Sequence, residues 1–73
     1  MTLNQLQPGE TGRIVGVLGQ GAFRRRLLEL GLVSGTRITR QGAAPLGDPL
    51  TYRVRGAVLA LRKIDALTIE IEG

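Results

Sequence analysis

Glycine and proline residues divide this sequence into short segments. Their spacing restricts the possible folds more than any other feature of the sequence. Between such breaks, polar and apolar residues alternate, so that one face of each segment can be buried, which is typical of β-strands. The segments that read this way are 13–18, 36–41, 50–55, 57–61 and 67–72. Short strands with tight connections predict an all-β fold of five antiparallel strands, and closure into a small barrel would remove exposed edges.

The alternation also predicts which side chains face the core. The inward set is Leu50, Tyr52 and Val54 in the third segment, Leu59 and Leu61 in the fourth, and Leu67, Ile69 and Ile71 in the fifth. On the outer face, we expect Arg53 and Arg55 to pair across strands with Glu70 and Glu72, as oppositely charged neighbours do. Two exposed carboxylates without further ligands make a poor metal site, so we predict none.

Residues 20–35 contain the one convincing helical spacing. Phe23, Leu27 and Leu30 recur at i, i+4 and i+7, which makes a narrow apolar stripe on one side of a helix. Gly31 fits the left-handed residue that commonly ends a helix. We expect this small helical insertion to lie over one open end of the barrel, and single helical turns over 2–6 and 62–66.

Composition excludes several classes of function. The 73 residues favour a single domain, 1–73, and the chain has neither cysteine nor histidine. Disulfides, Cys/His zinc sites and Ser-His or Cys-His nucleophile pairs are therefore excluded, and no glycine cluster fits a phosphate-binding loop. We predict a protein that is not an enzyme and carries no cofactor. No apolar run could span a membrane and no signal peptide is recognisable, which predicts a cytoplasmic protein.

The charge of the chain points to an anionic partner. Ten Lys and Arg against six Asp and Glu give a net charge of +4, which suits an acidic protein surface, anionic lipid or nucleic acid. Arg24, Arg25 and Arg26 fall in the first half of the predicted helix, where the helix dipole disfavours each cation by about 0.3–1 kcal/mol. They form either a docking patch or an ordinary solvated face. An arginine finger acting on a GTPase is a weaker alternative.

Two further features are candidates for partner contact. Leu28 lies between Arg24 and Arg25 around the helix, and it is either part of the core, which we favour, or an exposed apolar contact. Residues 42–49 contain two prolines and two glycines, which exclude regular structure. For Leu46 and Asp48 in this stiffened loop we expect partner contact, because a stiff loop loses little entropy on binding.

Several motifs together resemble the FeoA family of ferrous iron transport. They are Leu-Gln-Pro-Gly-Glu-Thr-Gly-Arg-Ile (6–14), Arg-Arg-Arg-Leu-Leu-Glu-Leu-Gly-Leu (24–32) with Gly35, Ala-Pro-Leu-Gly-Asp-Pro-Leu (44–50), Val-Arg-Gly (54–56) and Leu-Ala-Leu-Arg (59–62). The resemblance covers nearly the whole chain. It implies an SH3-like barrel with a helical insertion in the bacterial cytoplasm, and a partner, FeoB, which is a membrane ferrous iron transporter with a cytosolic GTPase domain.

The leading hypothesis is therefore a small adaptor that binds and modulates the cytosolic part of such a transporter and is recruited by it to the inner face of the membrane. Its contact residues would be Arg24, Arg25, Arg26, Leu28, Leu46 and Asp48. One alternative is nucleic-acid binding, against which we note that Phe23 and Tyr52, the two aromatic residues, are both assigned to the core. Another is a self-associating module that forms a homo-oligomer.

Overall fold

The computed structural model describes all residues from Met1 to Gly73. Its strands are β1 (Thr11–Val17), β2 (Arg37–Ala43), β3 (Leu50–Val54), β4 (Ala57–Leu61) and β5 (Ile69–Glu72). Its helical segments are η1 (Leu3–Gln5), α1 (Ala22–Glu29) and α2 (Lys63–Ala66). Five short strands with one longer helix are as the sequence predicts, and no helix is both long and apolar enough to cross a bilayer.

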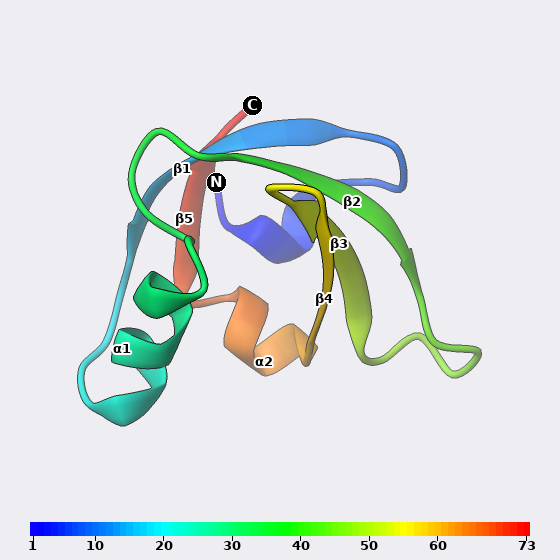
Figure 1. Cartoon of the computed structure of the whole chain (residues 1–73). Coiled ribbons are helices and arrows are strands. Elements are labelled where there is room, and N and C mark those ends of the chain that lie inside the picture. The colour runs from blue at the N-terminus through cyan, green and yellow to red at the C-terminus, as the bar shows by residue number, and fades with distance from the viewer.

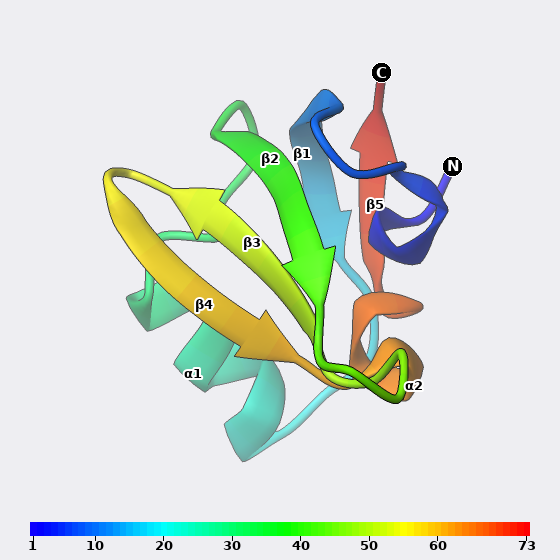
Figure 2. The same cartoon turned by 90° about the vertical axis from the view of Figure 1, so that its right-hand side faces the viewer.

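The five strands form one antiparallel sheet in the order β4-β3-β2-β1-β5, which curls around the core (Figures 1 and 2). Each strand pairs with its neighbours in this order, and no ladder joins β4 to β5. The sheet therefore keeps two edges where full closure was expected. Register shifts in β1, between Ile14 and Gly16, and in β2, between Arg40 and Gly42, mark bulges that bend these strands around the core.

The strand order corrects the expected charge pairing across the sheet. Arg53 lies on β3, which pairs with β2 and β4, whereas Glu70 and Glu72 lie on β5, which pairs with β1. Arg55 has left the strand altogether and forms a two-residue turn with Gly56, at φ values of 52° and 78°. The prediction that Arg53 and Arg55 pair with Glu70 and Glu72 is wrong, because alternation identifies the face of a residue but not the order of the strands.

A single core of 14 buried apolar residues fills the inside of the sheet. The inward faces of β3, β4 and β5 supply Leu50, Tyr52, Val54, Leu61, Ile69 and Ile71, all buried as predicted. Leu59 is partly buried and packs against this core. Leu67 is 51% exposed and corrects the prediction, because it lies in the turn after α2 instead of at the start of β5.

The predicted end of α1 at Gly31 is confirmed in atomic detail. Gly31 has a φ of 98°, and its N–H donates to Leu28 O at 3.0 Å while Leu32 N–H donates to Leu27 O at 3.1 Å. These two bonds define a Schellman motif, in which a left-handed residue satisfies the last helical carbonyls. Leu27 and Leu32, at its two ends, are both buried. The helix stop is thus fixed to the core by the two leucines on either side of it.

Tyr52 ties the N-terminal segment to the sheet. Its ring is fully buried and its hydroxyl donates to Leu3 O at 3.3 Å. Arg40 holds the same segment from the other side, because its Nη1 donates to Leu6 O at 2.7 Å and its Nε to Gly42 O at 3.1 Å. Burial raises the pKa of the Tyr52 phenol above its usual value, and the nearby Arg40 charge opposes this in part.

Tyr52→Phe should lower the free energy of unfolding by about 1 kcal/mol at neutral pH, because the hydroxyl loses its hydrogen bond to Leu3. The raised pKa adds a pH signature. In the unfolded chain the phenol ionises near pH 10, while in the folded protein it stays neutral, so its stabilising contribution is present below about pH 10 and is lost as the pH rises further. Urea unfolding curves of both proteins should converge above pH 10; parallel pH profiles would contradict this.

Candidate partner-binding face

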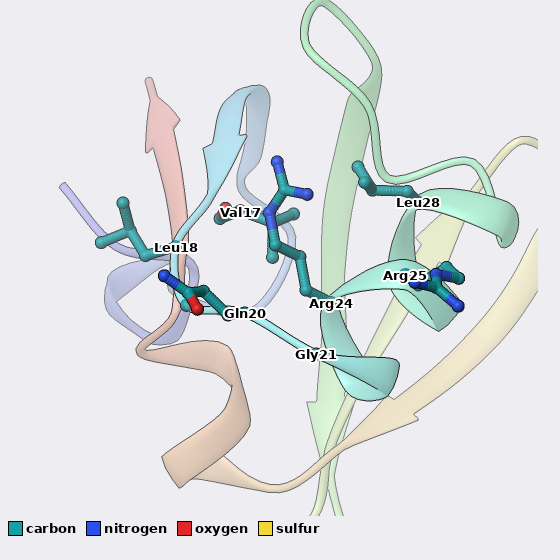
Figure 3. Close-up of a pocket in the computed structure, with 8 residues that line it drawn as sticks. Val17, Leu18, Gln20, Gly21, Arg24, Arg25 and Leu28 are labelled. Carbon is teal, nitrogen blue, oxygen red and sulfur yellow. Dashed lines mark hydrogen bonds between the residues drawn. The ribbon is translucent and has the colours of Figure 1, made fainter.

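The start of α1 encloses the larger hollow of the molecule. The segment Gly19-Gln20-Gly21 leads from β1 into α1, and no side chain caps the helix at Gly21. The hollow has a volume of about 580 Å³ and is lined by Val17, Leu18, Gly19, Gln20, Gly21, Arg24, Arg25 and Leu28 (Figure 3). It therefore contains three of the six residues that the sequence predicts to contact a partner: Arg24, Arg25 and Leu28.

Arg24 is anchored in this hollow by the end of β1. Its Nε donates to Val17 O at 3.1 Å, so the side chain crosses from α1 to the end of β1, as Figure 3 shows. The two terminal nitrogens of the guanidinium have no protein partner and remain available to an acceptor from outside. Arg24 is thus both a structural link and a positioned donor.

Arg25 and Arg26 are exposed and form no hydrogen bond or ion pair through their side chains. The one salt bridge in the structure joins Arg62 to Asp65 at 3.0 Å. Because α1 has only eight residues, Arg26 already lies in its last turn, where the dipole favours a cation. The unfavourable dipole position therefore applies to Arg24 and Arg25, not to all three arginines as expected.

The apolar stripe of α1 is only partly buried. Leu27 is 1% exposed, whereas Phe23 and Leu30, one helical period to either side, are 41% and 47% exposed. The prediction of a core stripe is therefore wrong at both ends, because a two-turn helix reaches the core through its middle residue. The placement of Phe23 in the core is corrected with it. The helix consequently presents apolar side chains beside its free cations.

Leu28 combines the two roles that the sequence left open. It packs against the core cluster yet remains partly exposed, and it lines the hollow beside Arg24 and Arg25. An apolar floor between two guanidinium groups is suited to an acidic segment that also carries an aliphatic or aromatic side chain.

The loop over residues 44–49 gives Leu46 and Asp48 different environments. Leu46 is 98% exposed at the tip and has no place in the core. Asp48 is exposed, but its Oδ1 accepts a hydrogen bond from Lys63 N–H at 2.9 Å, which satisfies a free donor at the start of α2. A contribution of Asp48 to the fold is therefore visible, and Leu46 is the residue of this loop that is free to contact a partner.

The structure does not bring the loop and α1 together into one small patch. The loop lies beside α2, where Asp48 meets Lys63. α1 lies beyond α2 in Figure 1 and apart from both segments in Figure 2. A partner that contacts both would have to reach across α2. Arg24, Arg25 and Leu28, which line the hollow, form the compact part of the predicted site, and Arg26 does not line it.

Sequence reasoning also missed Leu18 on this face. Leu18 is 54% exposed and lines the hollow opposite the helix. Strict alternation from Ile14 would bury Leu18, but the bulge at Gly16 shifts the pattern so that Val17 is buried instead. A glycine between two β-branched residues is the signal that could have indicated the bulge.

Comparison with known proteins places this fold and these motifs in a family. The model of the FeoA domain matches residues 1–73. A fusion protein of Porphyromonas gingivalis (strain ATCC BAA-308 / W83), Fe(2+) transport protein A joined to the Fe(2+) transporter FeoB, is 46% identical over 72 residues. That match covers 99% of this chain, which spans 8% of the length of the fusion protein.

Solved structures agree in fold and sequence. The solution structure of FeoA from Chlorobium tepidum is 36% identical, has a TM-score of 0.92, and is matched over 99% of this chain and 69% of that one. FeoA of Stenotrophomonas maltophilia, described as a prokaryotic SH3 domain protein in complex with zinc, is 30% identical with a TM-score of 0.86 over 99% of this chain and 89% of that one. The SH3-like fold is thereby confirmed. This chain belongs to the FeoA family.

Proposed function

We propose that this chain is an accessory protein of bacterial ferrous iron uptake that binds and modulates the cytosolic part of a FeoB-type transporter. The observation that carries the proposal is the relative in which the same domain and the transporter form one polypeptide. Fusion keeps two units at high effective concentration, which is useful when they act on each other. As the sequence predicts, the family is non-catalytic, and binding is what the surface of this chain offers.

The proposed contact is the face that α1 presents, defined by Arg24, Arg25, Arg26 and Leu28 together with the exposed Phe23. Arg25 and Arg26 have no partner within the chain, and Phe23 exposes 41% of its surface next to them. Arginine and aromatic side chains are the types that contribute most at the centre of protein interfaces. Leu46 and Asp48 would be reached only by a partner that also spans α2.

Arg25→Glu with Arg26→Glu should weaken binding to the cytosolic GTPase domain of the transporter at least tenfold, because two attractive contacts become repulsive. Folding should be unaffected, since neither side chain contacts the rest of the chain through a hydrogen bond or ion pair. The measurement is isothermal titration calorimetry at two salt concentrations.

The matched control is Arg13→Glu with Arg37→Glu, which changes the net charge equally on the outer face of the sheet, where the two residues are direct cross-strand neighbours. Binding that survives this control and is lost in the helix variant assigns the contact to α1. Equal losses would mean a general charge effect, and unchanged affinity in the helix variant would remove α1 from the interface.

One observation favours nucleic-acid binding as a second candidate. Phe23 is exposed on the helix that carries Arg24, Arg25 and Arg26, which supplies an aromatic side chain for stacking on a basic element. Titration with a single-stranded oligonucleotide tests it. Phe23→Leu should then weaken binding several-fold, whereas a leucine would serve equally well in an apolar protein contact.

A further inference from the structure

One of the two edges of the sheet is covered by another part of the chain, and the other edge is not. The open edge of β5 is covered by the N-terminus: Ile71 N–H donates to Met1 O at 2.8 Å, the Met1 amino group donates to Ile71 O at 3.2 Å, and Thr2 forms a bridge with Glu70. β4 pairs with β3 on one side and with nothing on the other, as Figure 2 shows. β4 is therefore the one strand with a free edge.

The hairpin geometry shows which backbone groups this edge offers. Arg55 and Gly56 form a two-residue turn, so the closing pair Val54–Ala57 is of the hydrogen-bonded kind. Alternate residues of β4 then bond to β3, and Val58 and Ala60 between them turn their N–H and C=O groups away. No backbone group of residues 57–61 forms a hydrogen bond outside the ladder.

β4 lacks the charges, proline and bulges by which proteins commonly protect an edge strand. Its sequence is Ala-Val-Leu-Ala-Leu, without charge or proline, and it contains no bulge along its register with β3. Ala57, Val58 and Ala60 are exposed, Val58 to 59%. An exposed apolar edge of this kind is a template for pairing with another strand.

The charges at the two ends of β4 indicate which kind of strand could pair with its free edge. Arg55 precedes the strand, and Arg62, which is paired with Asp65, and Lys63 follow it. If a second copy paired antiparallel about Leu59, Arg55 of one copy would lie opposite Lys63 of the other, and this repulsion disfavours self-pairing. An apolar strand with acidic residues at its ends would instead meet a cation at each end, in either direction.

We propose that the free edge of β4 accepts an extended segment of a partner protein by strand addition, and that this segment is apolar in its middle and acidic at its ends. The main-chain groups of Val58 and Ala60 supply the hydrogen bonds, and Arg55 and Lys63 select the flanking acids. The site lies on a different element from α1, so it does not depend on the helix contact proposed above.

The test uses NMR on the labelled full chain with the acetylated and amidated peptide Glu-Thr-Val-Thr-Val-Thr-Val-Thr-Glu, whose glutamates fall opposite Arg55 and Lys63 when its middle valine lies opposite Leu59. Binding should shift the amide signals of residues 57–61 and slow hydrogen exchange of the Val58 and Ala60 amides about tenfold or more, since both amides become bonded. The control peptide, with lysine in place of both glutamates, should bind at least fivefold more weakly.

Ala60→Pro removes the outward N–H and should abolish the shifts, while Ala60→Ser keeps the N–H and should retain them. Binding that survives Ala60→Pro, equal binding of both peptides, or absence of shifts in 57–61 up to millimolar peptide would overturn the proposal. Concentration-dependent shifts of these residues without peptide would overturn it in favour of a second copy. The comparison of the two peptides does not require the variant, so it remains decisive even if Ala60→Pro fails to fold.

Discussion

Leu27→Ala should lower the free energy of unfolding by about 3 kcal/mol, the largest effect expected on α1. Leu27 is 1% exposed, belongs to the single core cluster, and supplies the carbonyl that accepts the Leu32 N–H at the helix end. Its truncation leaves a cavity at the point where the helix is attached. Because a domain of this size has little stability to spare, the variant should be close to unfolding at room temperature.

Leu30→Ala is the matched control, since it removes the same atoms from a side chain that is 47% exposed. It should cost about 1 kcal/mol or less. Urea unfolding followed by circular dichroism measures both variants. If the two substitutions destabilised the protein equally, the helix would be attached by its whole apolar stripe and not mainly through Leu27.

Gly12→Ala should destabilise the protein by about 2 kcal/mol, because the strand leaves no room for a methyl group. A Cβ at this position would lie 2.9 Å from Ile71 Cδ1 and 3.2 Å from the backbone oxygen of Glu72. Ile71 is itself buried, and the Glu72 oxygen belongs to the backbone of the paired strand β5. Neither atom can therefore move away from an added methyl group without a loss of stability. The substitution should loosen the contact between β1 and β5.

Gly16→Ala provides the comparison within the same strand. A Cβ there would meet nothing within 4 Å, so this variant should be unchanged or more stable by about 0.5 kcal/mol, through the lower entropy of its unfolded chain. Thermal unfolding of both variants under identical conditions is the measurement. A loss at Gly16 equal to that at Gly12 would show that glycine is needed in β1 for its backbone and not for the space it leaves.

The sequence was sufficient for features that depend on local spacing. Alternation identified the buried faces of β3 and β5 apart from Leu67, and Gly31 marked the end of α1, because both signals repeat with the geometry of one element. The same reasoning failed for Arg53, whose cross-strand neighbours are set by strand order, and for Phe23, whose exposure depends on how far a short helix reaches across the barrel.

In the candidate site, too, the features set by local sequence could be predicted and the contacts set by the fold could not. Arg25 and Arg26 could be recognised as a concentrated charge, but the anchoring of Arg24 on Val17 and the bond from Lys63 N–H to Asp48 join residues whose proximity is set by the fold. The close packing around Gly12 likewise involves Leu6 and Ile71, which lie far apart in the chain. Contacts of this kind carry no local sequence signal.

The most direct test of the central claim, that α1 is the face that binds the transporter, is an amide NMR titration of the labelled chain with the cytosolic GTPase domain, repeated at higher salt. We expect the shifts to be concentrated in residues 20–31 and to weaken as salt screens the arginine contacts. Absence of shifts in α1 would contradict the claim, as would shifts confined to the β2–β1 surface or to the loop over residues 44–49.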